Sequence, residues 1–175
     1  MTKERKRLIT DIIIVICLLV LDQITKYLAR TYLADGPIEI VKGVFSFTLL
    51  QGGNSGAAFG MMQGGFWFFM IATAIVVAAD LWVLIKIPAE KHFNLLRLSL
   101  VLLLAGAFGN CIDRIVTKIS TGVSSVTDFM YFELIDFPIF NVADICVTFA
   151  AIFLIVSGVF VYKDKDFNLV FKGHE

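Results

Sequence analysis

The sequence has few charged residues and few cysteines. Only 17% of its 175 residues are charged, against about 25% in a typical soluble domain. The formal net charge is zero, so no overall field favours nucleic acid as a partner. The three cysteines, Cys17, Cys111 and Cys146, are an odd number, and each lies within or at the end of an apolar run. We therefore interpret them as packed apolar side chains and not as a disulfide or metal site.

Apolar side chains are abundant instead. They make up 58% of the chain, and the mean hydropathy is +0.85. A soluble fold of this size cannot hide so much apolar surface, so the natural solvent is lipid. A helix needs about 20 apolar residues to cross a bilayer core. Four stretches qualify: about Ile12 to Tyr32, Phe66 to Ile87, Leu95 to about Val116, and Val142 to Tyr162. The sequence thus predicts an all-α membrane protein with four transmembrane helices, forming a single domain over residues 1–175.

The basic residues predict the orientation of the helices. They gather before the first span, between the second and third, and after the fourth, at Lys3, Arg5, Lys6, Arg7, Lys86, Lys91, Arg97, Lys163, Lys165 and Lys172. Such loops stay in the cytoplasm, so both termini are expected there. The basic start and first apolar run also resemble a secretory signal peptide, but no A-x-A-like site follows. An uncleaved first span is therefore favoured. The tail from Lys163 to Glu175 is expected to be solvated.

The two outer connections predict more than simple loops. Ile38-Glu-Ile-Val and Val44-Phe-Ser-Phe-Thr-Leu-Leu are short strand patterns bounded by glycines. The segment from Lys118 to Phe140 contains a second β-like stretch and the pair Phe137-Pro138. We expect a small extracytoplasmic β platform and a structured outer loop.

Polar residues of the spans collect at one depth, near the outer surface. Ionisable side chains inside a membrane are costly, so each is a functional candidate. With the predicted orientation, three helices and two loops supply such groups there: Asp22, Lys26, Asn54, Asn110, Asp113, Arg114, Asp128, Asn141 and Asp144. Asp80 is the exception, because it falls in the cytoplasmic half of the second span. We expect Asp80 to be structural, facing a neighbouring helix or reaching toward Lys86.

Each of these residues also has a plainer interpretation. Asp22 and Lys26, four residues apart, can form an intrahelical ion pair. Asn141 can be the N-cap of the fourth span, with Asp144 at the third helical position. Asp113 with Arg114 can tether a helix end, and Asn54 can be a turn residue. These interpretations account for single residues but not for their shared depth.

Several aspartates at one site predict acid–base chemistry. Two carboxylates a few ångströms apart can share one proton, so that one activates water while the other polarises a carbonyl, which is a route to peptide hydrolysis. A zinc peptidase would need histidines, but His92 and His174 both fall on the cytoplasmic side, which also excludes a Cys–His pair. No spacing favours a Ser–Lys pair. A proton or ion pathway through Asp22, Asp113, Asp128 and Asp144 remains an alternative, as in a small proton-linked transporter or channel subunit.

Five motifs give the sequence a family resemblance. They occur in the order Asp22-Gln-Ile-Thr-Lys26, Asn54-Ser-Gly-Ala-Ala-Phe59, Gly109-Asn-Cys-Ile-Asp-Arg114, Val126-Thr-Asp-Phe129 and Phe140-Asn-Val-Ala-Asp144. Each motif alone is weak, but five in order across four spans are specific. The chain resembles the bacterial lipoprotein signal peptidases (type II signal peptidases) over nearly its whole length.

The resemblance implies a site and a substrate. It implies a catalytic dyad of Asp128 and Asp144 that cuts prolipoprotein signal peptides before a diacylglyceryl-modified cysteine, beside membrane lipid. It implies supporting and substrate-binding roles for Asn54, Asn110, Asp113, Arg114, Asn141, Asp22 and Lys26. The family acts in the bacterial cytoplasmic (inner) membrane, at its outer face, and is inhibited by the cyclic peptide globomycin. No metal or other cofactor is expected.

Overall fold

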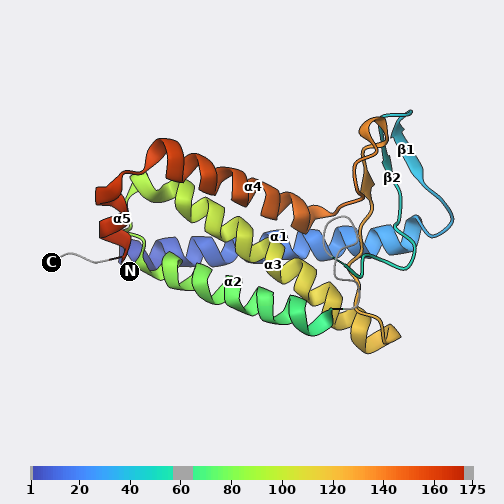
Figure 1. Cartoon of the computed structure of the whole chain (residues 1–175), viewed down its shortest axis with the longest axis horizontal. Helices are drawn as coiled ribbons and strands as arrows, with labels where there is room; N and C mark the ends of the chain where they lie inside the picture. The colour runs from blue at the N-terminus through green and yellow to red at the C-terminus, as the bar shows by residue number, and fades with distance from the viewer. Residues whose placement is uncertain (1, 57–64, 172–175) are drawn as a thin grey trace.

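Long helices make up most of the structure. The computed structural model describes residues 2–56 and 65–171 (Figure 1). The long helices are α1 (Lys3–Tyr32), α2 (Phe66–Lys86), α3 (Asn94–Thr121), which follows the short 3-10 turn η2 (Lys91–Phe93), and α4 (Val142–Val156), which continues into the π-helical turn η4 (Ser157–Val161). In the described part of the chain, four helical segments are long and apolar enough to cross a membrane. The predicted all-α membrane fold is therefore confirmed.

Two helices run beyond the apolar stretches that predicted them. Helix α1 begins at Lys3, where the Thr2 side chain accepts a hydrogen bond from the Arg5 N–H at 3.3 Å. Helix α3 continues to Thr121 and ends at Gly122, whose φ of 79° is the left-handed conformation that commonly stops a helix. Polar residues can extend a helix into water, so the apolar run marks the span and not the helix end.

A small sheet lies at the end of the bundle opposite both termini, which we call the distal end (Figure 1). Its strands are β1 (Ile38–Val41), β2 (Phe45–Phe47) and β3 (Met130–Tyr131), antiparallel in the order β1-β2-β3. The 3-10 turn η3 (Glu133–Ile135) follows β3. This sheet confirms the expected β platform. The third strand was not predicted, because two residues are too short to show an alternating pattern.

We call the end of the bundle that carries both termini the terminal end. Its C-terminal segment differs from the solvated tail that the sequence predicted. Residues 164–171 form helix α5 (Asp164–Phe171) and are not a solvated tail. Val170 is buried in an apolar core with Leu84, Phe93 and Leu100, and Leu169 packs against the same core. The prediction was wrong because a helix of eight residues is enough to bring Leu169 and Val170 onto a small apolar end.

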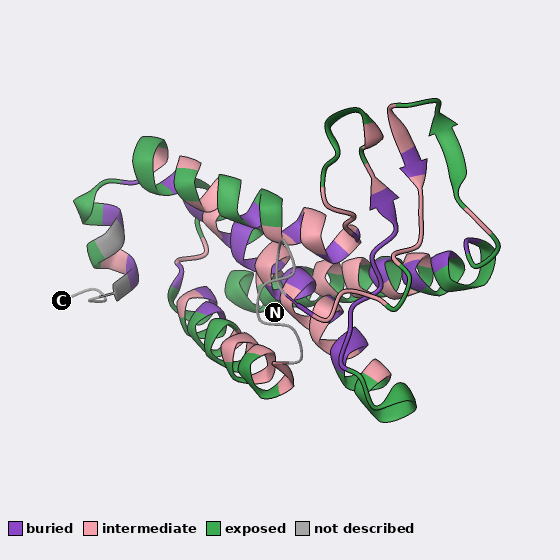
Figure 2. Ribbon diagram, turned by 45° about the vertical axis from the view of Figure 1, so that its right-hand side comes forward, coloured by how far each residue is buried: buried purple, intermediate pink, exposed green. Residues whose placement is uncertain are grey.

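Helix α3 is central and contacts α1, α2 and α4. Two glycines allow this close packing, because a Cβ atom at Gly106 would lie 2.6 Å from the Ala143 carbonyl oxygen, and one at Gly109 would lie 2.7 Å from Asp22 Oδ2. Small residues bring membrane helices together in this way. Figure 2 shows the consequence: buried residues concentrate along the inner helices and the loops beside the sheet, while the outward faces remain uncovered by protein.

Candidate active site

Lys26 lies at the centre of a buried polar cluster at the distal end. Its side chain is 0% exposed, and its Nζ is 2.9 Å from Asp22 Oδ2 and 3.6 Å from Asp113 Oδ2. It also donates a hydrogen bond to Asn110 Oδ1 at 3.0 Å. A buried ammonium group needs such partners to offset its loss of water. The intrahelical pair with Asp22 is present, but the contacts also connect α1 to α3.

Asp22 positions the start of α4. Its Oδ1 accepts a hydrogen bond from the Ala143 N–H at 2.9 Å. That N–H is one of the first in the helix and has no partner within it. A carboxylate is also favoured there by the helix dipole. Asp22 therefore fixes α4 against α1, in addition to neutralising Lys26.

Asn141 is the N-cap of α4 and also reaches the rest of the site. Its side chain accepts a hydrogen bond from the Asp144 N–H at 3.0 Å, and Asp144 Oδ2 accepts one from the Asn141 N–H at 3.0 Å, which is a capping box. The Asn141 amide donates to Asp128 Oδ1 at 2.6 Å and to Asn110 Oδ1 at 3.1 Å. The capping interpretation is thus correct, and the same residue brings Asp128 and Asp144 to one place.

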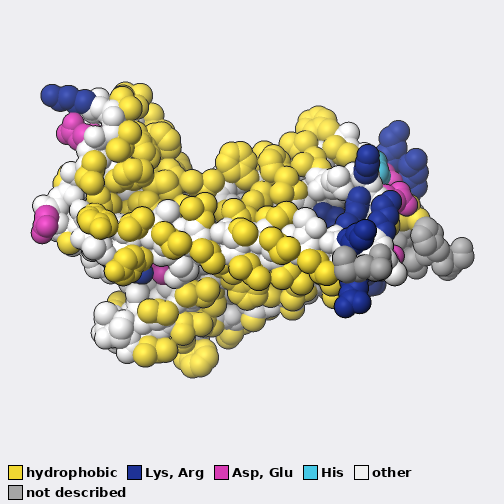
Figure 3. All heavy atoms as spheres, turned by 180° about the vertical axis from the view of Figure 1, so that it is seen from behind, with side chains coloured by type: hydrophobic (Ala, Val, Ile, Leu, Met, Phe, Trp, Pro, Cys, Tyr) yellow, Lys and Arg dark blue, Asp and Glu magenta, His cyan; other side chains and the backbone are white. Residues whose placement is uncertain are grey.

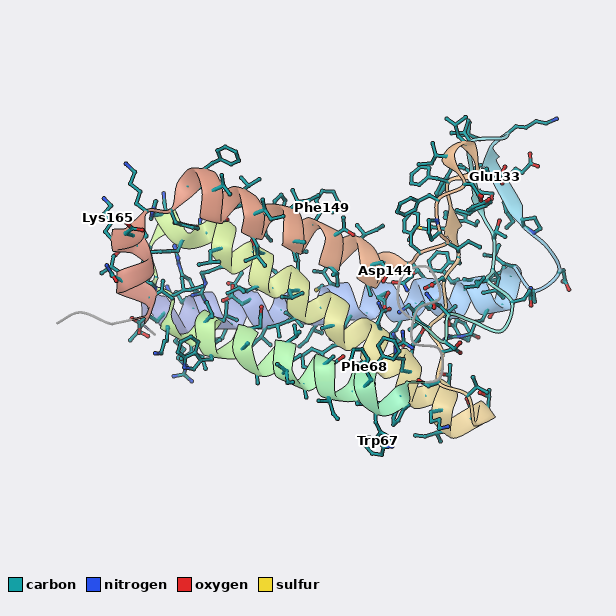
Figure 4. The ribbon with its side chains drawn as sticks, viewed as in Figure 1. Trp67, Phe68, Glu133, Asp144, Phe149 and Lys165 are labelled. Carbon is teal, nitrogen blue, oxygen red and sulfur yellow. The ribbon has the colours of Figure 1, made fainter. Side chains whose placement is uncertain are left out.

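Asp128 enters the cluster from the loop between α3 and α4. It is 1% exposed, and its Oδ2 accepts a hydrogen bond from Asn54 Nδ2 at 2.9 Å. Burial, and secondly the negative charge of Asp144, raise the pKa of Asp128 to about 6, although hydrogen bonds from Asn54 and Asn141 act against this. Asp144 is half-buried and accepts a hydrogen bond from Asn110 Nδ2 at 2.8 Å. Figure 4 labels Asp144 at the start of α4, beside the distal loops.

The Asn54 loop is held by backbone pairing. Asn54 N–H donates to the Val126 carbonyl oxygen at 2.8 Å, and Val126 N–H donates back at 2.9 Å. Gly53 precedes it with a φ of 69°, and a Cβ atom there would lie 2.7 Å from Ser125 Oγ. Only glycine fits this close approach without strain. The rest of this motif, residues 57–59, lies outside the described residues.

Asp113 supports the loop from behind the site. Its Oδ2 accepts the Thr127 N–H at 2.8 Å, next to Asp128 in the chain. Arg30, which the sequence reasoning did not select, donates to Thr127 Oγ1 at 2.6 Å and lies 3.6 Å from Asp113 Oδ1. Arg30 is four residues after Lys26, on the same helix face, and this spacing was a usable signal.

Arg114 has one donor without a hydrogen-bond partner among the described residues. Its Nη2 donates to the Gly56 carbonyl oxygen at 2.6 Å, and its guanidinium lies 3.8 Å from the centre of the Phe69 ring. Its Nη1 is buried and has no hydrogen-bond partner among the described residues. An unpartnered guanidinium N–H is costly in a buried site. Arg114 is therefore ready to bind a carbonyl or carboxylate oxygen.

Two cavities meet at the aspartates. One, of about 240 Å³, is lined by Asp128 and Asp144 together with Arg114 and the small residues Gly106, Ala107 and Cys111. The other, of about 470 Å³, lies between the loop before α4 and α4 itself, and its lining includes Phe137, Pro138, Phe140, Ile145 and Phe149. Asn54, Asp128 and Asp144 line both cavities. Asp22, Lys26, Asp113 and Asn141 line neither of them.

Asp80 is not part of this cluster. It is 3% exposed, between Val77 and Leu84 on the α2 face that joins the apolar core. Neither carboxylate oxygen has a hydrogen-bond partner among the described residues. Lys86 lies over the Trp82 ring instead, with its Nζ 4.2 Å from the ring centre. The suggested contact from Asp80 to Lys86 was therefore wrong, whereas the expectation that Asp80 faces the helix packing is consistent with its burial.

Comparisons with known proteins agree over most of the chain. The family model described as "Signal peptidase (SPase) II" matches residues 14–160. The lipoprotein signal peptidase of Symbiobacterium thermophilum is 45% identical over 141 residues, which cover 79% of this chain and 86% of that protein. The lipoprotein signal peptidase of Streptococcus pyogenes is 33% identical over 166 residues, which cover 94% of this chain and 99% of that protein.

Two solved structures share the fold. Both are described as bacterial membrane enzyme structures obtained by the in meso method, one at 2.3 Å and one at 1.9 Å resolution. Their TM-scores are 0.75 and 0.72, each at 32% sequence identity. The first match covers 86% of this chain and 87% of the solved chain, and the second covers 87% and 94%.

Proposed function

The chain belongs to the signal peptidase II family, and from this membership we propose that it removes signal peptides from diacylglyceryl-modified prolipoproteins, cutting before the lipidated cysteine. The proposed catalytic groups are Asp128 and Asp144. The observation that carries the proposal is that these two carboxylates line both cavities and are held together by Asn141, which donates a hydrogen bond to each of them.

The proposed chemistry needs one proton shared between the two aspartates. The ionised carboxylate accepts a proton from water, and the resulting hydroxide attacks the scissile carbonyl carbon. The protonated carboxyl donates its proton to the carbonyl oxygen. The carboxyl that took the water proton then gives it to the leaving amine as the C–N bond of the tetrahedral intermediate breaks, and the other carboxylate takes back a proton from a hydroxyl of the intermediate, which restores the one-proton dyad. The raised pKa of Asp128 supports this role, because a carboxyl with a pKa of about 6 can hold a proton much closer to neutral pH than an ordinary aspartate.

The two cavities suggest where the substrate lies. The larger one has an apolar lining and borders Phe149, which points outward from α4 in Figure 4 and is 48% exposed. An apolar cavity open toward lipid suits the diacylglyceryl group. The smaller one suits the residues before the cut, because Gly106, Ala107 and Cys111 leave little room for a large side chain. The Nη1 of Arg114, which has no partner within residues 2–56 and 65–171, would bind a substrate carbonyl there.

The charge distribution supports the proposed orientation in the membrane. Figure 3 shows apolar side chains over most of the body and Lys and Arg side chains gathered at the terminal end. The positive-inside tendency then places both termini in the cytoplasm and the site near the outer face of the bacterial cytoplasmic membrane. A membrane-embedded signal peptide that ends at the outer interface would reach the dyad, and the lipid of the cysteine would remain in the bilayer. Globomycin is expected to inhibit the enzyme.

The test is cleavage by the purified protein in detergent. A diacylglyceryl-modified prolipoprotein is added with and without globomycin, and Asp128→Asn and Asp144→Asn are assayed beside the wild type. Asp35→Asn is the matched control, because Asp35 is an exposed carboxylate at the same end of the molecule. We expect cleavage by the wild type and the control, inhibition by globomycin, and a loss of at least about 10³-fold in both dyad variants, as for other catalytic groups.

Other outcomes would change specific parts of the proposal. A folded wild type that never cleaves would contradict the peptidase function, and the proton-linked transporter alternative would be tested next. If one dyad variant still cleaves, that aspartate is structural and Asp113 becomes the next candidate. Monodisperse elution and an unchanged melting temperature are required of every variant before its activity is interpreted.

A further inference from the structure

A further cavity lies at the terminal end, far along the bundle from the aspartates. It encloses about 670 Å³ between the first turns of α1, the last turn of α2, the connection to α3, and α5. One part of its lining is apolar and includes Leu8, Ile85 and Leu169. The other part is polar and basic, with Thr2, Arg5 and Lys86. The cavity therefore has the two-sided character of the boundary between headgroups and acyl chains.

Arg97 forms a fixed positive wall of this cavity. Its Nη2 pairs with Asp11, and its Nη1 lies 3.5 Å from the Leu84 carbonyl oxygen and 3.4 Å from that of Ile87, at the end of α2. The side chain is only 10% exposed, and its Nε has no hydrogen-bond partner among the described residues. These contacts keep the guanidinium group from rotating out into water. Its charge is offset by Asp11, so Arg97 contributes a fixed guanidinium group to the lining, while the other cations, Arg5 and Lys86, are exposed.

The charge of the surface around the cavity favours an anion, whereas the charges of the lining itself are balanced. Glu4 and Glu90 also line the cavity, and Asp11 offsets Arg97. The surrounding surface adds Lys3, Lys6, Arg7 and Lys91, so basic side chains outnumber acidic ones at this end. The concentration of dark blue side chains is visible in Figure 3. The Arg7 guanidinium also donates to the Glu90 carbonyl oxygen at 2.8 Å, which ties α1 to the connection before α3.

We propose that this cavity binds an anionic phospholipid, with the phosphate between Arg5 and Lys86 in front of Arg97 and an acyl chain along Leu8 and Ile85. Both apolar side chains point outward, being 44% and 77% exposed, so they lie where lipid tails run. The ends of membrane helices are at headgroup level, and basic pockets between them bind anionic headgroups. A free phosphate ion would use the basic groups but would leave the apolar half of the cavity unfilled.

The test is lipid retention by the full-length chain in detergent, measured by native mass spectrometry. The protein is titrated with phosphatidylglycerol and, separately, with phosphatidylcholine of the same acyl chains. We expect phosphatidylglycerol to bind more tightly. In Arg5→Ala and in Lys86→Ala its affinity should fall about fivefold each, and roughly 25-fold in the double variant, because each basic group near the surface contributes a similar attraction.

The control is Lys165→Ala, which removes an exposed cation of the same end that does not line the cavity. It should keep wild-type affinity, and Arg5→Lys should keep most of it. Arg97 is left intact, because its loss would unpair Asp11. Equal retention of both lipids, or an equal loss in Lys165→Ala and Lys86→Ala, would overturn the proposal. Displacement of phosphatidylglycerol by millimolar inorganic phosphate would show a free-phosphate site and would overturn the lipid assignment.

Discussion

At the scale of single residues, neutral amides hold the two candidate catalytic carboxylates. Asn54 and Asn141 donate to Asp128, and Asn110 donates to Asp144. An amide N–H fixes the position of a carboxylate without placing a full positive charge beside it. The only ammonium nearby, that of Lys26 in the described cluster, contacts Asp22 and Asp113 directly and reaches the dyad through Asn110. This arrangement leaves the dyad able to hold one proton.

Asn54→Ala should shift the pH dependence of cleavage. The pKa of Asp128 is raised from 3.8 to about 6, and the Asn54 hydrogen bond acts to lower it. The one-proton dyad is lost when Asp128 ionises, so kcat/KM of the wild type should fall as the pH rises through this pKa. Without the hydrogen bond from Asn54, the ionised form of Asp128 is less favoured and its pKa rises. The fall of kcat/KM with rising pH should therefore move to higher pH, by about half a unit. The measurement is kcat/KM from pH 4.5 to 9.

The control for this prediction is Asn94→Ala, an exposed asparagine at the terminal end. It should leave the profile unchanged. A shift of the Asn54→Ala limb toward lower pH would contradict the assigned direction. The same pKa also affects stability: the folded chain binds this proton more tightly than the unfolded chain, so Asp128 favours folding below pH 4 and loses that contribution between about pH 4 and 6.

Arg114→Lys should lower kcat/KM about tenfold or more. The guanidinium contacts Gly56 and stacks on Phe69, and its Nη1 has no partner in the described part of the chain and is proposed to bind substrate. An ammonium group has no planar fork and cannot make these contacts together, and hydrogen bonds to charged groups are worth about 1.5–3 kcal/mol. The measurement is steady-state cleavage of the same prolipoprotein, beside a melting curve. Full activity in the variant would count against a substrate-binding role.

Asp80→Leu should keep activity and raise stability. The Asp80 carboxyl is buried in an apolar core, and its oxygens lack partners among the described residues. Leucine has a similar size and loses no hydrogen bond, so the gain is on the order of 1–3 kcal/mol. The melting temperature in detergent and the cleavage rate are the two readouts. If even Asp80→Asn abolished cleavage in a folded protein, Asp80 would belong to the working site.

At the scale of elements, the start of α4 organises the site. The Ala143 N–H in its first turn donates to Asp22 from α1, and its capping box fixes both Asn141 and Asp144. Helix α3 must come close for Asn110 to reach Asp144, and Gly109 permits this. The start of α4, the close approach at Gly109 and the ion pair between Asp22 and Lys26 therefore depend on one another.

Gly109→Ala should destabilise the bundle. The added Cβ atom would lie 2.7 Å from Asp22 Oδ2 and 3.0 Å from the Ala143 Cβ, so α1 or α4 must shift. Overpacking of this kind costs about 1–3 kcal/mol, and cleavage should fall because Asp22 holds α4. The measurement is the melting temperature together with the cleavage rate. Gly158→Ala is the matched control, because no atom lies within 4 Å of its added Cβ; an equal effect in the control would contradict the packing argument.

At the scale of the whole molecule, polarity is divided between the two ends. The catalytic candidates and the sheet lie at the distal end, and the basic cluster and α5 at the terminal end (Figures 1 and 3). The uncovered surface between them is apolar, as four membrane spans require. The direction of the chain in the membrane then decides on which side cleavage takes place.

Cysteine labelling should show the site at the outer face. A single cysteine introduced as Asp35→Cys, in a background with Cys17, Cys111 and Cys146 replaced by alanine, should react with a membrane-impermeant maleimide in intact spheroplasts. The matched variant Lys165→Cys should react only after permeabilisation, because the basic end is expected in the cytoplasm. The reverse pattern would invert the proposed orientation.

The sequence by itself determined the number of spans, the collection of polar residues at one level, and the family. Hydropathy and charge are local properties, and a membrane turns them directly into helices with a direction. Only the tertiary structure decided which of those residues contact one another and which line the cavities. That Arg30 joins Thr127, that α5 closes the apolar end, and that Asp80 lacks a visible partner depend on side chains from distant segments. Such contacts follow from how closely the helices pack, as at Gly106 and Gly109, where α3 approaches α4 and α1.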